Sequence, residues 1–441
     1  MTKTKKDILK LIDDNKIKYI RLCFTDILGK IKGMSITRRE IEQVMDEGQG
    51  FDGSSVEGFA RIEESDLMAM PDPVTFRIIP WDIAGEKVAM MFCDITNPDG
   101  TPYDGDPRWV LRKNLQRVKD KNWTFYVGPE IEYFYFENNN GTKGLDQDGY
   151  FDYGTVDKGT IVRKKTVNAL EEIGIAVECS HHEVAPSQHE IDLRYQEALI
   201  MADFAQVYKF IVKEIAMENG IYATFMPKPI FGENGSGMHC HMSLFEGERN
   251  LFFDKKGEYH LSQLGKSFMA GILKHVKEFA LVTNQWVNSY KRLVPGYEAP
   301  VYISWGRKNR SSMVRVPGYR QGKEKATRIE LRSPDPAANS YLAYACMLNA
   351  GLKGIEENYE LPAPIEDNIF HMSEEEKSKL KFDILPDSLA NAIKEFENSS
   401  LIRETLGDHV FEKLIANKKI EWNDYRMHVS QDEVDKYLPI L

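Results

Sequence analysis

The chain has 441 residues, enough for two or three domains, and its 42% hydrophobic and 28% charged residues are an ordinary globular composition. Its 57 lysines and arginines against 68 aspartates and glutamates give a net charge of −11, which argues against binding to nucleic acid or to an anionic membrane. No stretch approaches the roughly 20 apolar residues of a membrane span, and the charged N-terminus does not resemble a secretory signal. The five cysteines are an odd number without a Cys-x-x-Cys pair, so we expect a cytoplasmic protein without disulfides or a thiolate zinc site.

The first hundred residues predict a small α+β unit. Alternating apolar residues indicate strands, and apolar residues at helical spacing indicate helices. We expect helices at 6–14 and from Thr37, as the N-cap, to about Asp46, and strands at 19–24, 31–36, 76–80 and 87–93. Residues 97–106 are rich in proline and glycine, so we expect a domain boundary there that divides the chain into residues 1–100 and 101–441.

The second part predicts a larger α/β region. Helices are expected at 107–121, 199–219 and 337–353, and the charged tail from 372 onward should be mainly helical. Strands are expected at 125–136, 238–245, 301–305 and 327–331.

Carboxylate and imidazole side chains recur at a spacing of two on several of these strands. Such pairs share one face of a strand, as in Glu130 and Glu132. One Glu-x-Glu pair is more often an exposed polar face than a site. Several strands with the same pattern could instead converge on about five glutamates and one histidine, a donor set that suits Mg²⁺ or Mn²⁺. The other residues in this pattern are Glu183 and Glu190 around a turn, His239, His241, Glu330 and Arg332.

Seven arginines fall within residues 292–332 of this acidic chain. The simple interpretation is a solvated basic face. Arginine is also the residue that grips carboxylate or phosphate in a bidentate manner, and with divalent cations it provides the means for phosphoryl transfer. The sequence has no Walker loop, so an ATP-using enzyme of this kind would hold its phosphates with metals and arginine.

Seven segments in order along the chain resemble type I glutamine synthetase of bacteria and archaea over essentially the whole length. They are FDGSSVEGF (51–59), GPEIEYF (128–134), SHHEVAPSQHEID (180–192), KPIFGENGSGMHCHMSLF (228–245), NSYKRLVPGYEAPV (288–301), NRSSMVR (309–315) and RIELRSPDPAANSYL (328–342). The resemblance implies an α+β chain, with a small N-terminal β-grasp domain (1–100) and a large C-terminal catalytic α/β domain (101–441) whose antiparallel sheet lines the active site.

The resemblance also implies an activity and an assembly. The activity is ATP-dependent ligation of ammonia to L-glutamate, giving glutamine, ADP and phosphate through γ-glutamyl phosphate, as in nitrogen assimilation. Two or more Mg²⁺ or Mn²⁺ ions serve each site. The assembly is a homo-dodecamer of two stacked hexameric rings with active sites between subunits, and PII-like or small inhibitory proteins regulate some relatives.

Site residues follow from the same motifs. For the metals these are Glu132, Glu183 and Glu190 at one ion and Glu130, His239 and Glu330 at the other. For glutamate they are Asn234, Gly235, Arg292, Glu298 and Arg332. For the nucleotide they are Glu178, His241, Ser243, Arg310 and Arg315. For catalysis they are Asp52, which binds ammonium, Glu298 in the loop that closes the site, and Arg310 at the transferred phosphoryl group.

The sequence also bears on regulation and on two alternative functions. Phe370 stands where the adenylylated subfamily has its modified tyrosine, so we expect control by small molecules, with Arg61 at a position involved in glutamine feedback. The first alternative is a ligase on the same fold that joins glutamate to a polyamine or another amine. Asp52 and the intact 288–301 loop argue against this alternative. The other is a non-catalytic structural homologue, which should have lost metal ligands.

Overall fold

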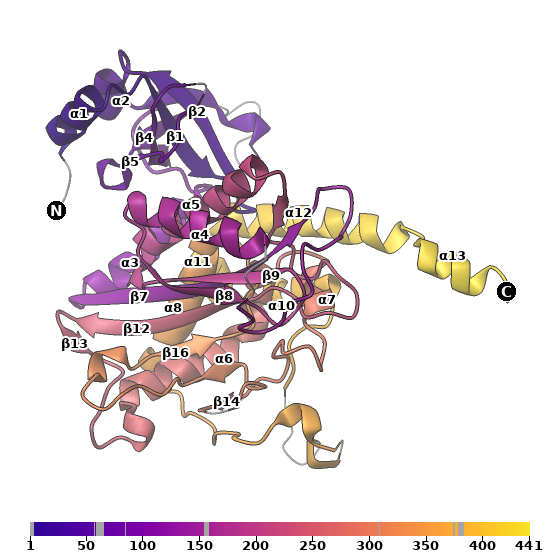
Figure 1. Ribbon diagram of the computed structural model, residues 1–441. Helices are drawn as coiled ribbons and strands as arrows, with labels where there is room; N and C mark the ends of the chain where they lie inside the picture. Colours follow the sequence, from indigo (N-terminus) through magenta and orange to yellow (C-terminus); the bar gives the residue numbers. More distant parts are fainter. Residues whose placement is uncertain are drawn as a thin grey trace.

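A computed structural model describes residues 4–56, 58, 66–83, 85–153, 158–307, 309–373, 375–377 and 383–441. Arg61, the expected regulatory residue, lies outside these ranges. No helix within them is long and apolar enough to cross a membrane. Figure 1 shows a smaller N-terminal part above a larger part, each built around a β-sheet.

The N-terminal part is a six-stranded sheet accompanied by two helices. Its elements are α1 (Lys5–Asp14), β1 (Tyr19–Thr25), β2 (Ile31–Thr37), α2 (Ile41–Glu47), β3 (Gln49–Asp52), β4 (Asp66–Pro71), β5 (Arg77–Ile78) and β6 (Val88–Thr96). The strand order is β2-β1-β6-β4-β3, with β5 beside β6, and only β1 and β6 run parallel. Apolar residues of the strands and of both helices form a core of their own, so the predicted small α+β unit is confirmed.

The predicted start of α2 at Thr37 is wrong. Thr37 is the last residue of β2, where it pairs with Tyr19 of β1, and its carbonyl accepts a hydrogen bond from Glu40 N (3.1 Å) in the following turn. The helix begins at Ile41, and Glu40 at the N-cap makes no side-chain capping bond. Pairing with β1 therefore outweighs the N-cap preference of threonine.

The larger part contains a ten-stranded sheet and most of the helices. Its elements are α3 (Pro107–Lys119), β7 (Trp123–Phe136), α4 (Lys158–Glu172), β8 (Val177–His182), β9 (Gln188–Leu193), β10 (Gln196–Glu197), α5 (Ala198–Glu218), β11 (Tyr222–Thr224), β12 (Met238–Glu246), β13 (Arg249–Asn250), α6 (Gln263–Thr283), α7 (Ser289–Arg292), β14 (Trp305–Gly306), β15 (Val314–Arg315), β16 (Ile329–Leu331), α8 (Ser340–Glu356), α10 (Leu389–Glu397), α11 (Ser400–Leu406), α12 (Asp408–Met427) and α13 (Gln431–Tyr437). The main strand order is β14-β15-β16-β12-β7-β9-β8, and every pair except β14–β15 is antiparallel. The expected antiparallel sheet is confirmed. The division of the chain at residue 100, between β6 and α3, stays a prediction.

The strand predicted at 301–305 is mostly wrong. Only Trp305 and Gly306 form a strand, β14, and Tyr302 makes an isolated bridge to Ile384. The backbone of this segment bonds instead to a loop that is far away in sequence, through Ile303 N to Asp383 O (2.8 Å) and Leu385 N to Val301 O (3.0 Å). These hydrogen bonds satisfy the backbone groups of the segment without regular pairing between strands.

The two faces of the large sheet differ in chemistry. Ile131 and Tyr133 of β7 are fully buried and belong to the main core, which also includes residues of α3, α5, α6 and α8. Glu130 and Glu132 alternate with them and line a cavity on the other face. The helices of the core therefore cover one face of the sheet and leave the other face for the cavity.

The start of α3 is fixed by a buried ionic network. Arg108, with 2% of its surface exposed, donates to Asp203 of α5 (Nε–Oδ1 and Nη2–Oδ2, both 3.0 Å), to Asp72 (Nη2–Oδ2, 2.8 Å) and to Asp94 of β6. Tyr341 of α8 donates a further hydrogen bond to Asp203 (2.6 Å). One guanidinium thus links the small sheet to three helices of the larger part.

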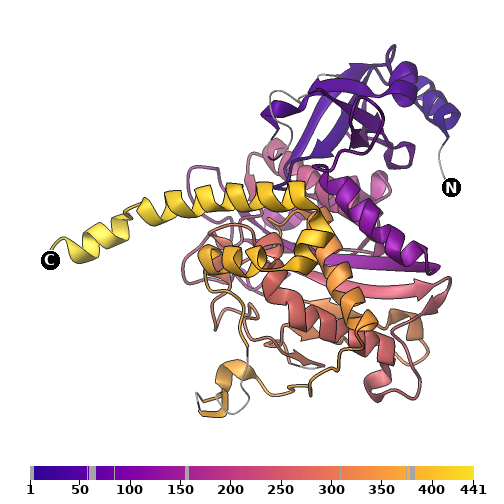
Figure 2. The same ribbon diagram turned by 180° about the vertical axis from the view of Figure 1, so that it is seen from behind.

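The C-terminal helices extend away from the rest of the chain. Figures 1 and 2 show α12 leaving the body and α13 lying beyond it. None of the residues of α13 is buried, and the apolar residues around it, Val429, Leu438, Ile440 and Leu441, are 67–98% exposed.

Candidate active site

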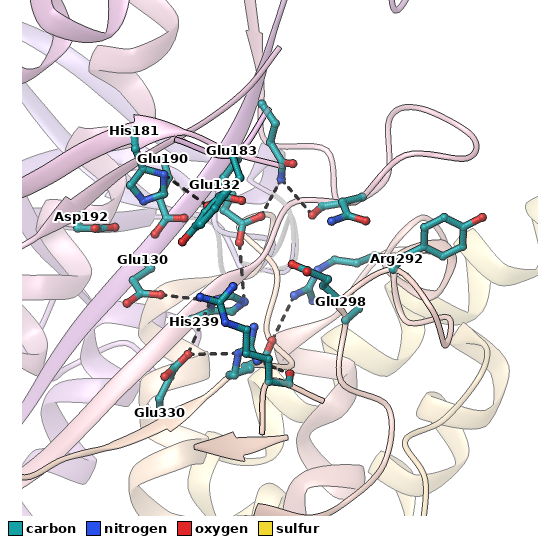
Figure 3. A pocket seen from close by; sticks show the side chains of 18 of the residues that line it. Glu130, Glu132, His181, Glu183, Glu190, Asp192, His239, Arg292, Glu298 and Glu330 are labelled. Atoms are coloured by element: carbon teal, nitrogen blue, oxygen red, sulfur yellow. Dashed lines mark hydrogen bonds and ion pairs between the residues drawn. The ribbon is translucent and has the colours of Figure 1, made fainter. Parts of the chain in front are cut away.

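A cavity of about 270 Å³ lies on the uncovered face of the large sheet. All six predicted metal ligands line it, and Figure 3 shows most of them pointing toward one another. The predicted glutamate-binding residues and two of the nucleotide-binding residues line the same cavity. These residues are Asn234, Gly235, Arg292, Glu298, Arg332, Arg310 and Arg315.

The strand register arranges the carboxylates in rows. Glu130 on β7 pairs with His239 of β12 on one side and with Asp192 of β9 on the other. Glu132 pairs with Glu190 of β9. Because side chains two residues apart share a face, the two rows lie next to each other on the cavity side.

One group of donors lies at Glu130, His239 and Glu330, whose ligand atoms all lie within 4.8 Å of one another. His239 Nδ1 is 3.2 Å from Glu130 Oε2 and 3.9 Å from Glu330 Oε1. These are the residues that the family resemblance assigned to the second ion, and the structure brings them together. Their role as ligands stays a prediction.

A second group consists of His181, Glu183 and Glu190, again within 4.8 Å. The family resemblance assigned Glu132, not His181, to this ion. Glu132 Oε2 accepts hydrogen bonds from Gln188 Nε2 (2.8 Å) and Gly237 N (2.9 Å), and Oε1 lies between the groups, 3.8 Å from His239 Nε2. One oxygen of Glu132 is thus held in place and the other faces the cavity.

The electrostatics of the carboxylates indicate a need for positive charge. Burial and repulsion from Glu183 raise the pKa of Glu132 to about 7. Burial and the neighbouring Asp192 raise the pKa of Glu190 well above its ordinary value. Ionised carboxylates in such a place repel each other unless a cation lies between them. Oxygen donors with one imidazole fit Mg²⁺ or Mn²⁺ better than a soft metal.

Glu130 is different because two histidines hold it in the ionised form. Burial alone would raise its pKa, but hydrogen bonds from His239 and His241 outweigh this and lower the pKa well below the ordinary value. Arg328 Nε donates to His241 Nδ1 (3.1 Å), so His241 Nε2 carries the proton that it donates to Glu130 Oε1 (2.6 Å). Arg328 therefore sets the tautomer of a histidine beside the predicted second ion.

Arginines line the same cavity. Arg292 is buried and donates to the carbonyls of Ser333 (2.7 Å) and Arg332 (3.2 Å), which fixes its guanidinium. Arg315 Nε lies 2.5 Å and Arg332 Nε 3.2 Å from the carboxylate of Glu330. Gly235 is required here because a Cβ would lie 2.3 Å from the carbonyl oxygen of Pro227.

The loop before β14 brings Glu298 to the cavity in a strained conformation. Its φ is +57°, a value that non-glycine residues rarely adopt and that is often found at functional sites. Arg310 lies 5.8 Å from the ring centroid of Tyr150 on the adjoining wall. Both predicted catalytic residues of this region therefore line the cavity.

The predicted nucleotide-binding residues divide between two cavities. Glu178, His241 and Ser243 line a second cavity of about 260 Å³, whereas Arg310 and Arg315 line the first. Glu130, Cys179 and Asp192 line both, so the two cavities are neighbours.

Asp52 is the one predicted catalytic residue that lines neither of these cavities. It ends β3 in the small sheet, where its Oδ1 accepts a hydrogen bond from Ser54 N (2.8 Å). The structure of one chain therefore does not bring Asp52 to the predicted ligands.

Sequence reasoning missed several residues that line the first cavity. His181 and Asp192 could have been found, because each is two residues from a predicted site residue. Tyr150 and Phe151 could not, since they lie in an irregular loop without a periodic pattern. The ring of Phe151 lies 4.7 Å from that of His181 and forms part of the wall.

This fold and site define a class: a cation-dependent enzyme that handles anionic substrates on an antiparallel sheet. A sequence profile of the glutamine synthetase catalytic domain matches residues 104–437, and one of the glutamine synthetase beta-grasp domain matches residues 16–98. The chain belongs to the glutamine synthetase family.

Relatives and solved structures are similar to the chain over nearly its whole length. The glutamine synthetases of Mycolicibacterium smegmatis and Clostridium saccharobutylicum are each 48% identical to the chain. The match to the first covers 100% of both proteins, and the match to the second covers 99% of this chain and 98% of the relative. The Plasmodium falciparum glutamine synthetase superposes with a TM-score of 0.91 at 25% identity, covering 99% of each chain. A complex of GmaS with ADP superposes with a TM-score of 0.90 at 30% identity, covering all of both chains. The expected fold class and enzyme, an ATP-dependent glutamine synthetase that uses divalent metals, are thereby confirmed.

Proposed function

We propose that the first cavity is the active site for ATP-dependent ligation of ammonia to L-glutamate, with γ-glutamyl phosphate as the intermediate. The observation that carries the proposal is that all six predicted ligands and four predicted arginines line one cavity. We assign Glu132, Glu183 and Glu190 to one ion and Glu130, His239 and Glu330 to the other, and propose Mg²⁺ or Mn²⁺ for both. His181 joins the first set because of its place beside Glu183 and Glu190.

The chemistry explains why such residues are needed. A carboxylate is a poor acyl donor to ammonia because oxide is a poor leaving group. In the first step a γ-carboxylate oxygen of glutamate attacks the γ-phosphorus of ATP and the bond to ADP breaks. Bound cations would neutralise charge on the phosphates, and Arg310 would contact the transferring phosphoryl group.

The second step needs free ammonia and a dry site. Ammonium has no lone pair to attack with, so a carboxylate must accept its proton, a role we assign to Asp52 together with Glu298. Ammonia then attacks the acyl carbon and phosphate leaves. Glu298 lies on the loop that would close over the intermediate and keep water from hydrolysing it. Asn234, Arg292 and Arg332 would hold the glutamate.

We infer that Asp52 reaches the site of an adjacent subunit, in a homo-dodecamer of two stacked hexameric rings. Two features of the chain support an assembly. Asp52 lines neither cavity of its own chain. The projecting C-terminal helix ends in apolar residues that are largely exposed, as interfaces between copies commonly are before assembly. We also propose a cytoplasmic location, and control by small molecules or by small regulator proteins.

A steady-state assay with glutamate and ATP tests the proposal. We expect equal amounts of glutamine and ADP with ammonium, and much slower turnover when putrescine replaces it. Each divalent metal is supplied separately, so the assay also shows whether Mg²⁺ or Mn²⁺ supports the faster rate. Faster turnover with putrescine would replace the proposal with an amine ligase. No turnover with any amine would indicate a non-catalytic homologue.

A further inference from the structure

Cys179 stands apart from the other cysteines of the chain. All five are described, and the other four, Cys23, Cys93, Cys240 and Cys346, are buried. Cys179 is exposed and lines both cavities, at the place where they adjoin. The proposed reaction gives this thiol no role.

Two further donor side chains accompany the thiol. Cys179 on β8 pairs with Asp192 on β9, and its Sγ lies 2.7 Å from Asp192 Oδ2. His181 lies two residues along β8 and lines the same cavity. One ligand atom from each of these three residues lies within 4.8 Å of the other two. Figure 3 shows His181 and Asp192 on the same side of the pocket.

Two of these three donors, His181 and Asp192, have an atom that is available to an ion. His181 Nδ1 lies 3.2 Å from the carbonyl oxygen of His182, and donation to this carbonyl leaves Nε2 with the free lone pair. Metal-binding histidines usually donate their other nitrogen to such a partner. Asp192 Oδ1 is buried and has no hydrogen-bond partner among the described residues. A buried carboxylate oxygen without a partner is costly unless a cation or water satisfies it.

We propose that Cys179, His181 and Asp192 form a third cation site, which takes a borderline or soft divalent metal such as Zn²⁺ or Cd²⁺. Thiolate, imidazole and carboxylate are the ligands of Zn²⁺, and three protein ligands leave a fourth position for water. The thiol releases its proton to solvent when the metal binds. The two neighbouring donor groups, Glu130–His239–Glu330 and His181–Glu183–Glu190, contain no sulfur and suit harder cations. The two kinds of site therefore select different metals.

The site has a consequence for the enzyme that rests on the proposed function. His181 also belongs to the donor group with Glu183 and Glu190, so a metal on Cys179 lies next to that group. The bound ion also places positive charge where the two cavities adjoin. We therefore expect Zn²⁺ and Cd²⁺ to inhibit glutamine synthesis even when Mg²⁺ is in excess.

Binding can be tested without turnover. The probe is Cd²⁺, titrated into the full-length protein with Mg²⁺ in excess, and the signal is the ultraviolet charge-transfer band of a cadmium thiolate. We expect the band to saturate at one Cd²⁺ per chain, to be lost in Cys179→Ala and to remain in Cys346→Ala, a control at a buried cysteine. Asp192→Asn should weaken Cd²⁺ binding by at least about tenfold, which corresponds to about 1.4 kcal/mol.

Two results would overturn this site. One is a thiolate band that persists in Cys179→Ala, and the other is complete displacement of Cd²⁺ by Mg²⁺, which would place the ion at the carboxylates. Because the band does not depend on activity, an inactive protein with a normal Cd²⁺ titration would contradict the proposed reaction and not the third site.

Discussion

Replacing Glu330 by alanine should abolish glutamine synthesis. We expect a loss of at least roughly a thousandfold in turnover, because a metal that stabilises the transferring phosphoryl group contributes several kcal/mol and each 1.36 kcal/mol is a factor of ten. Glu330 is 1% exposed and lies between Arg315 and Arg332, 3.9 Å from His239. Its removal would leave the proposed second ion short of a charged ligand and would take the carboxylate away from two arginines.

Glu132→Ala should reduce the rate of glutamine synthesis as strongly, because it removes a proposed ligand of the other ion. A metal titration should find two bound ions per chain in the wild type and one fewer in each variant. Glu248→Ala is a matched control, because Glu248 is an exposed glutamate that pairs only with Lys325 among the described residues and lies in neither cavity. Two ions in both Glu132→Ala and Glu330→Ala would argue against the assignment of the ligands.

Replacing Arg108 by alanine should strongly destabilise the fold. Arg108 is the shared cation of Asp72, Asp94 and Asp203, and its removal leaves the buried carboxylate of Asp203 without a cation, whereas Arg112 still contacts the other two. Removing one partner of a buried ion pair typically costs about 3–5 kcal/mol. We expect the midpoint of thermal unfolding to fall well below that of the wild type.

Arg112→Ala is the control for this experiment. Arg112 contacts two of the same aspartates, Asp72 and Asp94, but its side chain is 34% exposed. Exposed ion pairs contribute about 0–1 kcal/mol, so this variant should unfold close to the wild type. Equal unfolding midpoints for the two variants would show that the buried network does not hold the small sheet to the helices.

The site could be predicted from sequence where it depends on local alternation. Glu130 and Glu132, His239 and His241, and Glu330 and Arg332 each share a strand face, and a strand requires this of residues two apart. The pattern predicted that several strands carry such pairs. It did not predict which strands are neighbours, because β7 lies between β9 and β12 through contacts far apart in sequence.

Other parts could not be predicted because tertiary context decides them. The strand β9 was missed since Gln188, His189 and Glu190 are buried polar residues, which conceal the usual apolar alternation. Gln188 is buried because it bonds to Glu132, a partner 56 residues earlier. Thr37 carries a helix-capping side chain but is held in a strand by pairing with Tyr19.

Activation of the γ-carboxylate by phosphorylation is the central claim, and the fate of oxygen tests it most directly. Glutamate labelled with ¹⁸O in its γ-carboxylate is converted to glutamine with unlabelled ATP, and the released phosphate is analysed by mass spectrometry. If γ-glutamyl phosphate forms, the carboxylate oxygen that attacks the phosphorus leaves with it, so each phosphate carries one oxygen from glutamate. Phosphate without label, at a normal yield of glutamine, would contradict the acyl phosphate and the roles assigned to the cavity.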